Sequence, residues 1–268
     1  MQPWQGKDAD FESAQEALAA QFLTDGLPVI PPTVDRVAAM LAANHYAADE
    51  EISMLPPGFE SATAGDIAIC AVMAGCKPEY LPVLIAAVDA LSDMSFNLVG
   101  VGTTTGSAAP IYIVNGPIAE KLGINGKNNA LGSGHRANAT IGRAMTLILQ
   151  NIGGAKPGEV DMATLGQPAK YACCFAENVA ESPWEPLHVE RGFAPDASVV
   201  TAVGISGTGG GFEKFRREGR ERDLVHLEAG EMGDHACGHV AIHLRLDHPI
   251  RGGDDEAESC TRVDRFVG

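Results

Sequence analysis

Hydrophobic residues recur at helical spacing in several segments of the chain. In residues 10–22, Phe11, Ala14, Leu18 and Phe22 fall on one face of a predicted amphipathic helix. Further helices are predicted over residues 34–43 with Thr33 as N-cap, over residues 63–75 and 79–91 as a buried pair, and over residues 136–151.

Short apolar runs between these helices predict strands. They cover residues 27–30, 111–114, 171–175 and 198–203. Because short strands alternate with helices, the chain is expected to form an α/β or α+β fold of layered helices and short strands.

The composition changes near Gly207. The residues up to 211 contain 10 Lys and Arg and 3 His, whereas the shorter remainder contains 9 Lys and Arg and 5 His, with little hydrophobic periodicity. We therefore predict an α/β domain with a ligand site over residues 1–211. Residues 212–268 are predicted to form a polar, irregular tail that is disordered or divergent.

Charge and cysteine content narrow the class of protein. The net charge of -16 disfavours nucleic acid and anionic membranes as partners. No apolar run is long enough to cross a bilayer, and the N-terminus lacks the pattern of a targeting signal. The six cysteines suggest reduced thiols. These observations predict a cytoplasmic protein with a small-molecule partner, and they leave a homo-oligomer open.

A glycine- and threonine-rich stretch over residues 100–110 is the first candidate for a site. The hydroxyls of Thr103, Thr104, Thr105 and Ser107 and the neighbouring backbone amides can bind carboxylates, phosphates or carbonyls. The stretch lacks the lysine of a phosphate-binding P-loop and the spacing of a dinucleotide fingerprint. The alternative is a tight turn that covers the core.

The start of the helix over residues 136–151 is the second candidate. Ser133, His135 and Arg136 would lie at its N-terminus, where the helix dipole favours an anion. Asn138 and Arg143 follow along the helix. A capping role for these polar groups is the alternative.

The third candidate is the proline-stiffened segment over residues 182–192. It contains Glu185, His188, Glu190 and Arg191, so an acid, a base and a cation occur close together. A histidine near carboxylates can act as a general base. An ion-paired surface loop or a subunit contact is the alternative.

Cysteines and tail histidines supply the remaining candidates. Lys77 is expected to lower the pKa of Cys76, which makes this thiol a candidate nucleophile. Cys173 and Cys174 are adjacent on a predicted strand and should face opposite sides of it. In the tail, four residues have types and a spacing that could hold zinc, although they lack the zinc-protease pattern. These residues are His235, Cys237, His239 and His243.

Four longer motifs carry a resemblance to a known family. They are DGLPVIPPT at residues 25–33, MAGCKPEYLP at 73–82, GHRANATIGR at 134–143 and SPWEPLHVER at 182–191. With them, residues 23–193 resemble a bacterial family of thioredoxin-like proteins and UGSC-motif selenoprotein relatives. The selenocysteine- or cysteine-Gly-Ser-Cys motif is absent, and so is any C-x-x-C pair. The resemblance therefore implies an α/β small-molecule enzyme rather than dithiol redox chemistry.

Together these patterns predict an enzyme that acts on a small anionic or carbonyl-bearing molecule, with the reaction and cofactor unassigned. A non-catalytic subunit or binding module, and a zinc protein built on the tail, are the alternatives. The predicted catalytic residues are His135, His188, Glu185, Glu190 and Cys76, and the predicted substrate-binding residues are Thr103, Thr104, Thr105, Ser107, Ser133, Arg136, Asn138, Arg143 and Arg191.

Overall fold

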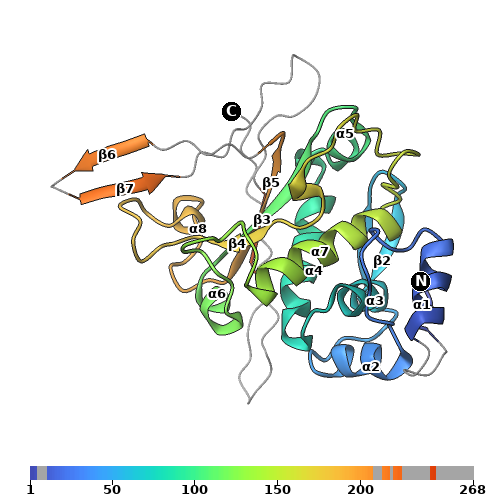
Figure 1. The fold of residues 1–268 in the computed structure, drawn as a ribbon. Helices are drawn as coiled ribbons and strands as arrows, with labels where there is room; N and C mark the ends of the chain where they lie inside the picture. The colour runs from blue at the N-terminus through green and yellow to red at the C-terminus, as the bar shows by residue number, and fades with distance from the viewer. Residues whose placement is uncertain (5–10, 208–212, 218–219, 225–241, 246–268) are drawn as a thin grey trace.

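The computed structural model describes residues 1–4, 11–207, 213–217, 220–224 and 242–245. It is a mixed α/β fold (Figure 1). The helices are α1 (Phe11–Ala20), α2 (Val34–Ala42), α3 (Ala64–Ala74), α4 (Leu81–Ser92), α5 (Leu98–Thr103), α6 (Pro117–Leu122), α7 (Arg136–Asn151) and α8 (Leu187–Glu190), with 3-10 turns at Pro78–Tyr80, Met94–Phe96 and Pro168–Lys170.

The strands form one larger sheet and two hairpins. In the larger sheet β4 and β3 are parallel, whereas β5 runs antiparallel to both β3 and β8. The strands of the sheet are β3 (Ala109–Asn115), β4 (Cys174–Ala176), β5 (Val199–Ile205) and β8 (Ile242–Arg245), and those of the hairpins are β1 (Glu51–Leu55) with β2 (Glu60–Thr63) and β6 (Glu213–Arg217) with β7 (Arg220–Leu224).

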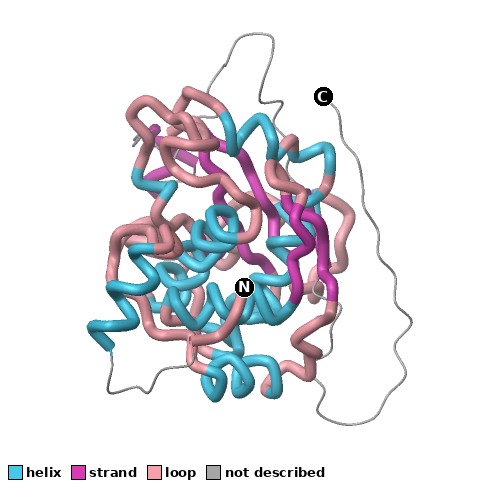
Figure 2. Tube along the Cα trace, turned by 90° about the vertical axis from the view of Figure 1, so that its right-hand side faces the viewer, coloured by secondary structure: helices cyan, strands magenta, loops and turns pink. Residues whose placement is uncertain are grey.

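Helices α4 and α7 pack against the larger sheet, α3 packs against both of them, and α2 packs against α3. In Figure 2 most of the helices lie on one side of the strands. Helices α3 and α4 are apolar around almost their whole circumference, which is typical of helices inside a core. None of the helices in the described ranges has the length and apolar character to span a bilayer.

Alternation along β3 divides the core in two. Tyr112 and Val114 belong to the main core, while Ala109 and Ile111 belong to a smaller cluster. Successive strand residues point to opposite faces, so the sheet is buried on both sides here. The prediction for the adjacent cysteines is confirmed in the same way: Cys174 lies in the main core and Cys173 in the smaller cluster.

Local sequence accounts for the helix ends that were predicted. The Thr33 hydroxyl accepts a hydrogen bond from the Arg36 amide at the start of α2. The Thr63 hydroxyl does the same for the Asp66 amide at the start of α3, and Gly75 ends that helix at a φ of 88°. Helix α7 has the predicted bounds. The predicted strands at 111–114 and 198–203 are also confirmed, whereas that at 171–175 is shorter and begins three residues later, as β4.

The predicted strand at residues 27–30 is wrong. The backbone of Val29 donates to and accepts from the Gln15 side chain, at 2.8 and 2.6 Å, and the Ile30 amide donates to the Met73 carbonyl. A side chain and a helix end therefore satisfy this backbone where a neighbouring strand would in a sheet.

Three further differences bear on the site. Phe11 and Phe22, expected on a buried face, are exposed, while Ala14 and Leu18 are buried as predicted. The first part of the glycine- and threonine-rich stretch is helix α5 rather than a loop. The hairpin of β1 and β2 was not predicted, because neither strand shows regular alternation of buried and exposed positions and each has a single fully buried residue.

Helix α7 approaches the chain just before β4 very closely at Gly142. A methyl group added there would lie 2.6 Å from the Cys173 backbone nitrogen and 3.1 Å from the Ala172 carbonyl carbon. Because backbone cannot rotate away as a side chain can, only glycine allows this separation of helix and strand.

We expect Gly142→Ala to destabilise the protein by up to about 2 kcal/mol, because a clash that costs up to about 3 kcal/mol is offset only in part by a gain in helix propensity of about 1 kcal/mol. Thermal and urea unfolding measure this change. Gly102→Ala in α5 is the matched control, since its nearest neighbours would lie at 3.7 and 3.9 Å. Equal stability of the two variants would contradict the close approach.

Candidate functional site

At the start of α7 the predicted ligand groups bind the protein's own backbone. The Arg136 guanidinium donates to the Gly75 carbonyl from Nε at 3.2 Å and from Nη2 at 2.9 Å, which caps the end of α3. The Asn138 side chain is buried, accepts from the Asn125 amide and donates to the carbonyls of Asn125 and Ala130. Ser133 and His135 precede these two residues, exposed and partly exposed respectively. Neither side chain caps α7 itself: Arg136 bonds the end of α3, and Asn138 bonds the loop over residues 125–130.

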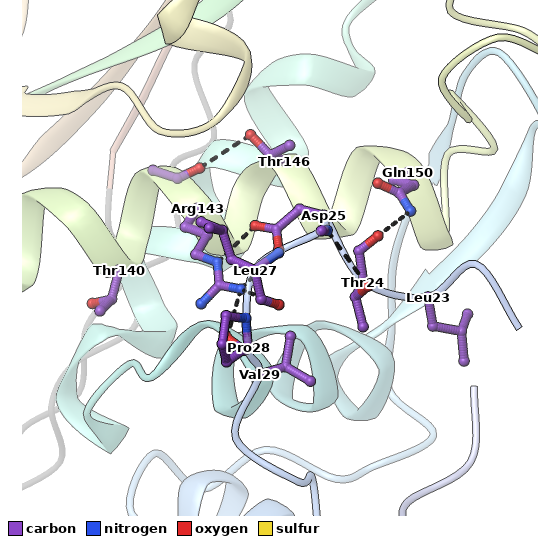
Figure 3. A network of polar contacts seen from close by, with 12 residues as sticks. Leu23, Thr24, Asp25, Leu27, Pro28, Val29, Thr140, Arg143, Thr146 and Gln150 are labelled. Atoms are coloured by element: carbon purple, nitrogen blue, oxygen red, sulfur yellow. Dashed lines mark hydrogen bonds and ion pairs between the residues drawn. The ribbon is translucent and has the colours of Figure 1, made fainter. Parts of the chain in front are cut away.

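Arg143 is held by an ion pair that fixes the segment after α1. Its Nε and Nη2 each lie 2.7 Å from an oxygen of Asp25, whose side chain is only 4% exposed. Nη2 also donates to the carbonyls of Leu27 and Pro28, at 3.3 and 2.9 Å (Figure 3). Further along α7, Gln150 donates to the carbonyls of Phe22 and Thr24. Four polar contacts thus bind Arg143 to the scaffold.

The expected activation of Cys76 by Lys77 is wrong. The thiol is buried and donates to the Thr140 carbonyl at 3.2 Å. Burial raises the pKa of Cys76 to about 12, and the nearby Arg136 charge offsets only part of that rise. The thiol therefore stays protonated near neutral pH.

The loop after α5 is tied to residues 161–167. The Thr105 carbonyl accepts from the Thr164 amide at 2.9 Å, and the Ser107 carbonyl accepts from the Gln167 side chain. The hydroxyls of Thr103 and Thr104 bond locally, to the Val99 carbonyl and from the Gly106 amide. This loop is a turn braced by a second loop.

A polar cluster of Asn115 and Glu177 lies at the carboxyl ends of the parallel strands β3 and β4, and α8, which carries His188, begins beside it. Asn115 ends β3 and donates from Nδ2 to Glu177 Oε2 at 2.5 Å, and the same oxygen accepts from the Leu187 amide at the start of α8. The buried His188 ring donates from Nε2 to the Pro195 carbonyl at 3.2 Å. Within the described part of the chain, His188 Nδ1, Asn115 Oδ1 and Arg191 Nε are buried without hydrogen-bond partners.

The carboxylate of this cluster is Glu177 and not either predicted one. Glu185 and Glu190 are exposed. Glu177 follows β4 directly and Asn115 ends β3, so only the parallel pairing of these strands brings the two residues together. The sequence signal that could have identified Asn115 and Glu177 is that each lies at or directly after the end of an apolar run. A role of His188 in proton transfer stays a prediction.

A cleft of about 1080 Å³ lies at the other end of β3, between α5, α7, the turn of the β1–β2 hairpin and residues 155–171. Apolar side chains form much of its wall, such as Val101 of α5 and Leu149 of α7. In the described part of the molecule, its lining includes Gly102 but none of the predicted catalytic or substrate-binding residues. The predicted groups therefore do not meet in this cleft.

Two residues that line the cleft have buried polar atoms without partners among the described residues. They are the Tyr112 hydroxyl and Gln167 Oε1. The Gln167 amide nitrogen donates to the carbonyls of Ser107 and Ile205, so the oxygen is the atom left unpaired. Burial raises the pKa of Tyr112 well above its ordinary value, and the phenol therefore keeps its proton.

Most of the predicted zinc site lies outside the described residues. This holds for His235, Cys237 and His239, and only the backbone of His243 is described, in β8 opposite Thr201. The predicted boundary between the domain and the tail, at residue 212, also lies among residues that the structure does not describe.

Comparison with known proteins gives no match: no family model fits the chain, and no curated protein or solved structure is significantly similar to it. Its function is therefore inferred from its own geometry.

Arg143→Ala should destabilise the protein by about 3 kcal/mol, because it leaves the buried Asp25 carboxylate without its countercharge. In a chain of this size the melting temperature should fall by about 6–12 °C. Arg136→Ala is the control: this residue is exposed and bonds one carbonyl, so a loss of about 1 kcal/mol is expected. A smaller effect at Arg143 than at Arg136 would refute the structural role of the ion pair.

Cys76 should resist alkylation by iodoacetamide at pH 7.5, because a thiol with a pKa of about 12 is almost entirely protonated there. The same cysteine should react within minutes once the protein is unfolded in guanidinium. Peptide mass spectrometry before and after unfolding measures both states. Rapid alkylation of Cys76 in the native protein would restore it as a candidate nucleophile.

Proposed function

We propose that the protein binds a small molecule with a carbonyl or carboxylate group in the cleft between α5, α7, β3 and residues 155–171. The observation that carries the proposal is the pair of unpaired polar atoms, the Tyr112 hydroxyl and Gln167 Oε1, on residues that line one cleft. A buried polar group without a partner costs about 1–3 kcal/mol, and a ligand that pairs with it recovers that free energy.

The chemistry of these atoms defines the part of the ligand that they recognise. A phenol donates a hydrogen bond to a carbonyl or carboxylate oxygen, whereas the Gln167 amide oxygen accepts one from a hydroxyl or an amine. A molecule with an acceptor and a donor close together, such as a 2-hydroxy acid, satisfies both, whereas a 2-oxo acid pairs with the Tyr112 hydroxyl alone. This keeps the predicted substrate class but assigns it to different residues.

Charged side chains of both signs line the cleft: Lys156 and Lys170, and the carboxylates of Asp161, Glu159 and Asp25, the last of which is paired with Arg143. Lys170 is paired with Asp161 at 2.6 Å, whereas the Lys156 ammonium makes no ion pair or hydrogen bond with any residue in the described ranges. In a chain with a net charge of -16, Lys156 provides a local positive charge beside the apolar wall. An anionic group on the ligand is expected to lie near it.

A hydrogen bond from Tyr112 to a carbonyl oxygen would also stabilise negative charge that develops on that oxygen during a reaction. For this reason the proposal includes catalysis. It also retains a cytoplasmic location, a homo-oligomeric assembly and the resemblance to the thioredoxin-like family as hypotheses. Binding without turnover would support the binding-module alternative.

Isothermal titration calorimetry with 2-oxobutanoate tests the proposal, because this probe carries a ketone and a carboxylate on a short chain. Tyr112→Phe should weaken binding about five- to tenfold, the effect of one lost hydrogen bond. The same change should raise the stability of the unliganded protein slightly, because it removes an unpaired buried hydroxyl.

Lys156→Gln should weaken binding of the same probe, more strongly at low salt than at high salt. Lys121→Gln is the matched control, since Lys121 is an exposed lysine of α6 away from the cleft. No binding by the native protein, or equal affinities in all variants, would overturn the proposal.

A further inference from the structure

Large apolar side chains line the cleft and are also open to solvent. Leu165 is 91% exposed, Phe22 69% and Tyr171 56%, and all three belong to the cleft lining. Phe22 follows α1, whereas Leu165 and Tyr171 belong to residues 155–171, yet all three share one cavity. Single exposed apolar residues are common, but a group of them on one cleft is typical of a binding surface.

The segment that carries Leu165 is fixed by polar contacts. Lys170 pairs with Asp161, and Thr164 donates to the Thr105 carbonyl from both its amide and its hydroxyl. Gln167 bonds two further carbonyls. Since the backbone on both sides of Leu165 is anchored, the exposure of this side chain is a built feature of the segment.

The backbone of Phe22 is also fixed by hydrogen bonds. Its φ of 55° is in the left-handed region, which bulky residues rarely adopt. Its amide donates to the Ala19 carbonyl at 2.9 Å, and its own carbonyl accepts from Gln150 at 2.9 Å. These bonds offset the backbone strain and keep the aromatic ring in the cleft lining.

The cleft therefore combines an exposed apolar wall with buried polar atoms. Phe22, Leu165 and Tyr171 are open to solvent, whereas the Tyr112 hydroxyl and Gln167 Oε1 are enclosed. The volume of about 1080 Å³ is at the upper end of the range of ligand pockets and far exceeds a short oxo-acid. A polar head alone would leave most of it empty.

We propose that the natural ligand is amphipathic, with a carbonyl or carboxylate head near Tyr112 and Gln167 and an aliphatic or aromatic tail against Phe22, Leu165 and Tyr171. This inference rests on the proposed function, because it places the tail relative to the head. A small molecule is favoured over a protein partner, since these exposed residues line the same cavity as Tyr112 and Gln167, whose unpaired polar atoms are buried.

A series of 2-oxo acids from 2-oxobutanoate to 2-oxooctanoate separates the head from the tail. Each added methylene that is buried should tighten binding about two- to fourfold, so the longest probe should bind at least fifteenfold more tightly than the shortest. Leu165→Ser should reduce this dependence on chain length. Leu131→Ser is the matched control, because Leu131 is also exposed but lies outside the cleft lining.

The outcomes are distinguishable. Binding of 2-oxobutanoate that Tyr112→Phe weakens, with no gain from longer chains, would overturn the amphipathic ligand and leave the proposed function standing. No binding of any member of the series would overturn the proposed function itself. A native dimer that Leu165→Ser converts to a monomer, with equal affinities for all chain lengths, would show that the apolar wall binds a second copy and would also overturn the inference.

Discussion

The close approach of α7 to the chain entering β4 is the constraint on which the rest of the structure depends. Gly142 allows it, since any side chain there would meet the backbone of residues 172 and 173. From this fixed position the same helix reaches α3 through Arg136, the segment after α1 through Arg143, and Phe22 through Gln150. One helix therefore fixes the positions of the sheet and of the neighbouring helices, and it forms one wall of the cleft.

The polar side chains of α7 illustrate why a residue rich in hydrogen-bonding groups is a weak indicator of a ligand site. Arg136, Asn138 and Arg143 satisfy backbone carbonyls and one buried carboxylate, groups that loops cannot pair by themselves. Their types match those of an anion site because the same charge-assisted bonds serve both purposes. In contrast, the two unpaired polar atoms on the cleft lining belong to Tyr112 and Gln167, which are not among the predicted site residues.

Strand β3 separates two polar regions. The cleft lining extends along β3 from Ala109 to Tyr112, and the cluster of Asn115 and Glu177 begins roughly 10 Å further along the strand, at the rise of an extended chain. The carboxyl ends of parallel strands are a common position for ligand sites in α/β sheets. Here Asn115 and Glu177 bond each other and the start of α8 at that position, while the cleft described above lies towards the opposite end.

The sequence by itself determined the local elements whose causes are local. The cap at Thr33, the apolar run of α3 up to Gly75 and the whole of α7 follow from residues a few positions apart. Only the tertiary structure decided what residues 27–30 pair with, because Gln15 takes the place of a strand. The tertiary structure also decided which buried polar atoms have no hydrogen-bond partner among the described residues. Whether Tyr112 or Arg143 has a partner depends on contacts between residues far apart in sequence, which no spacing rule encodes.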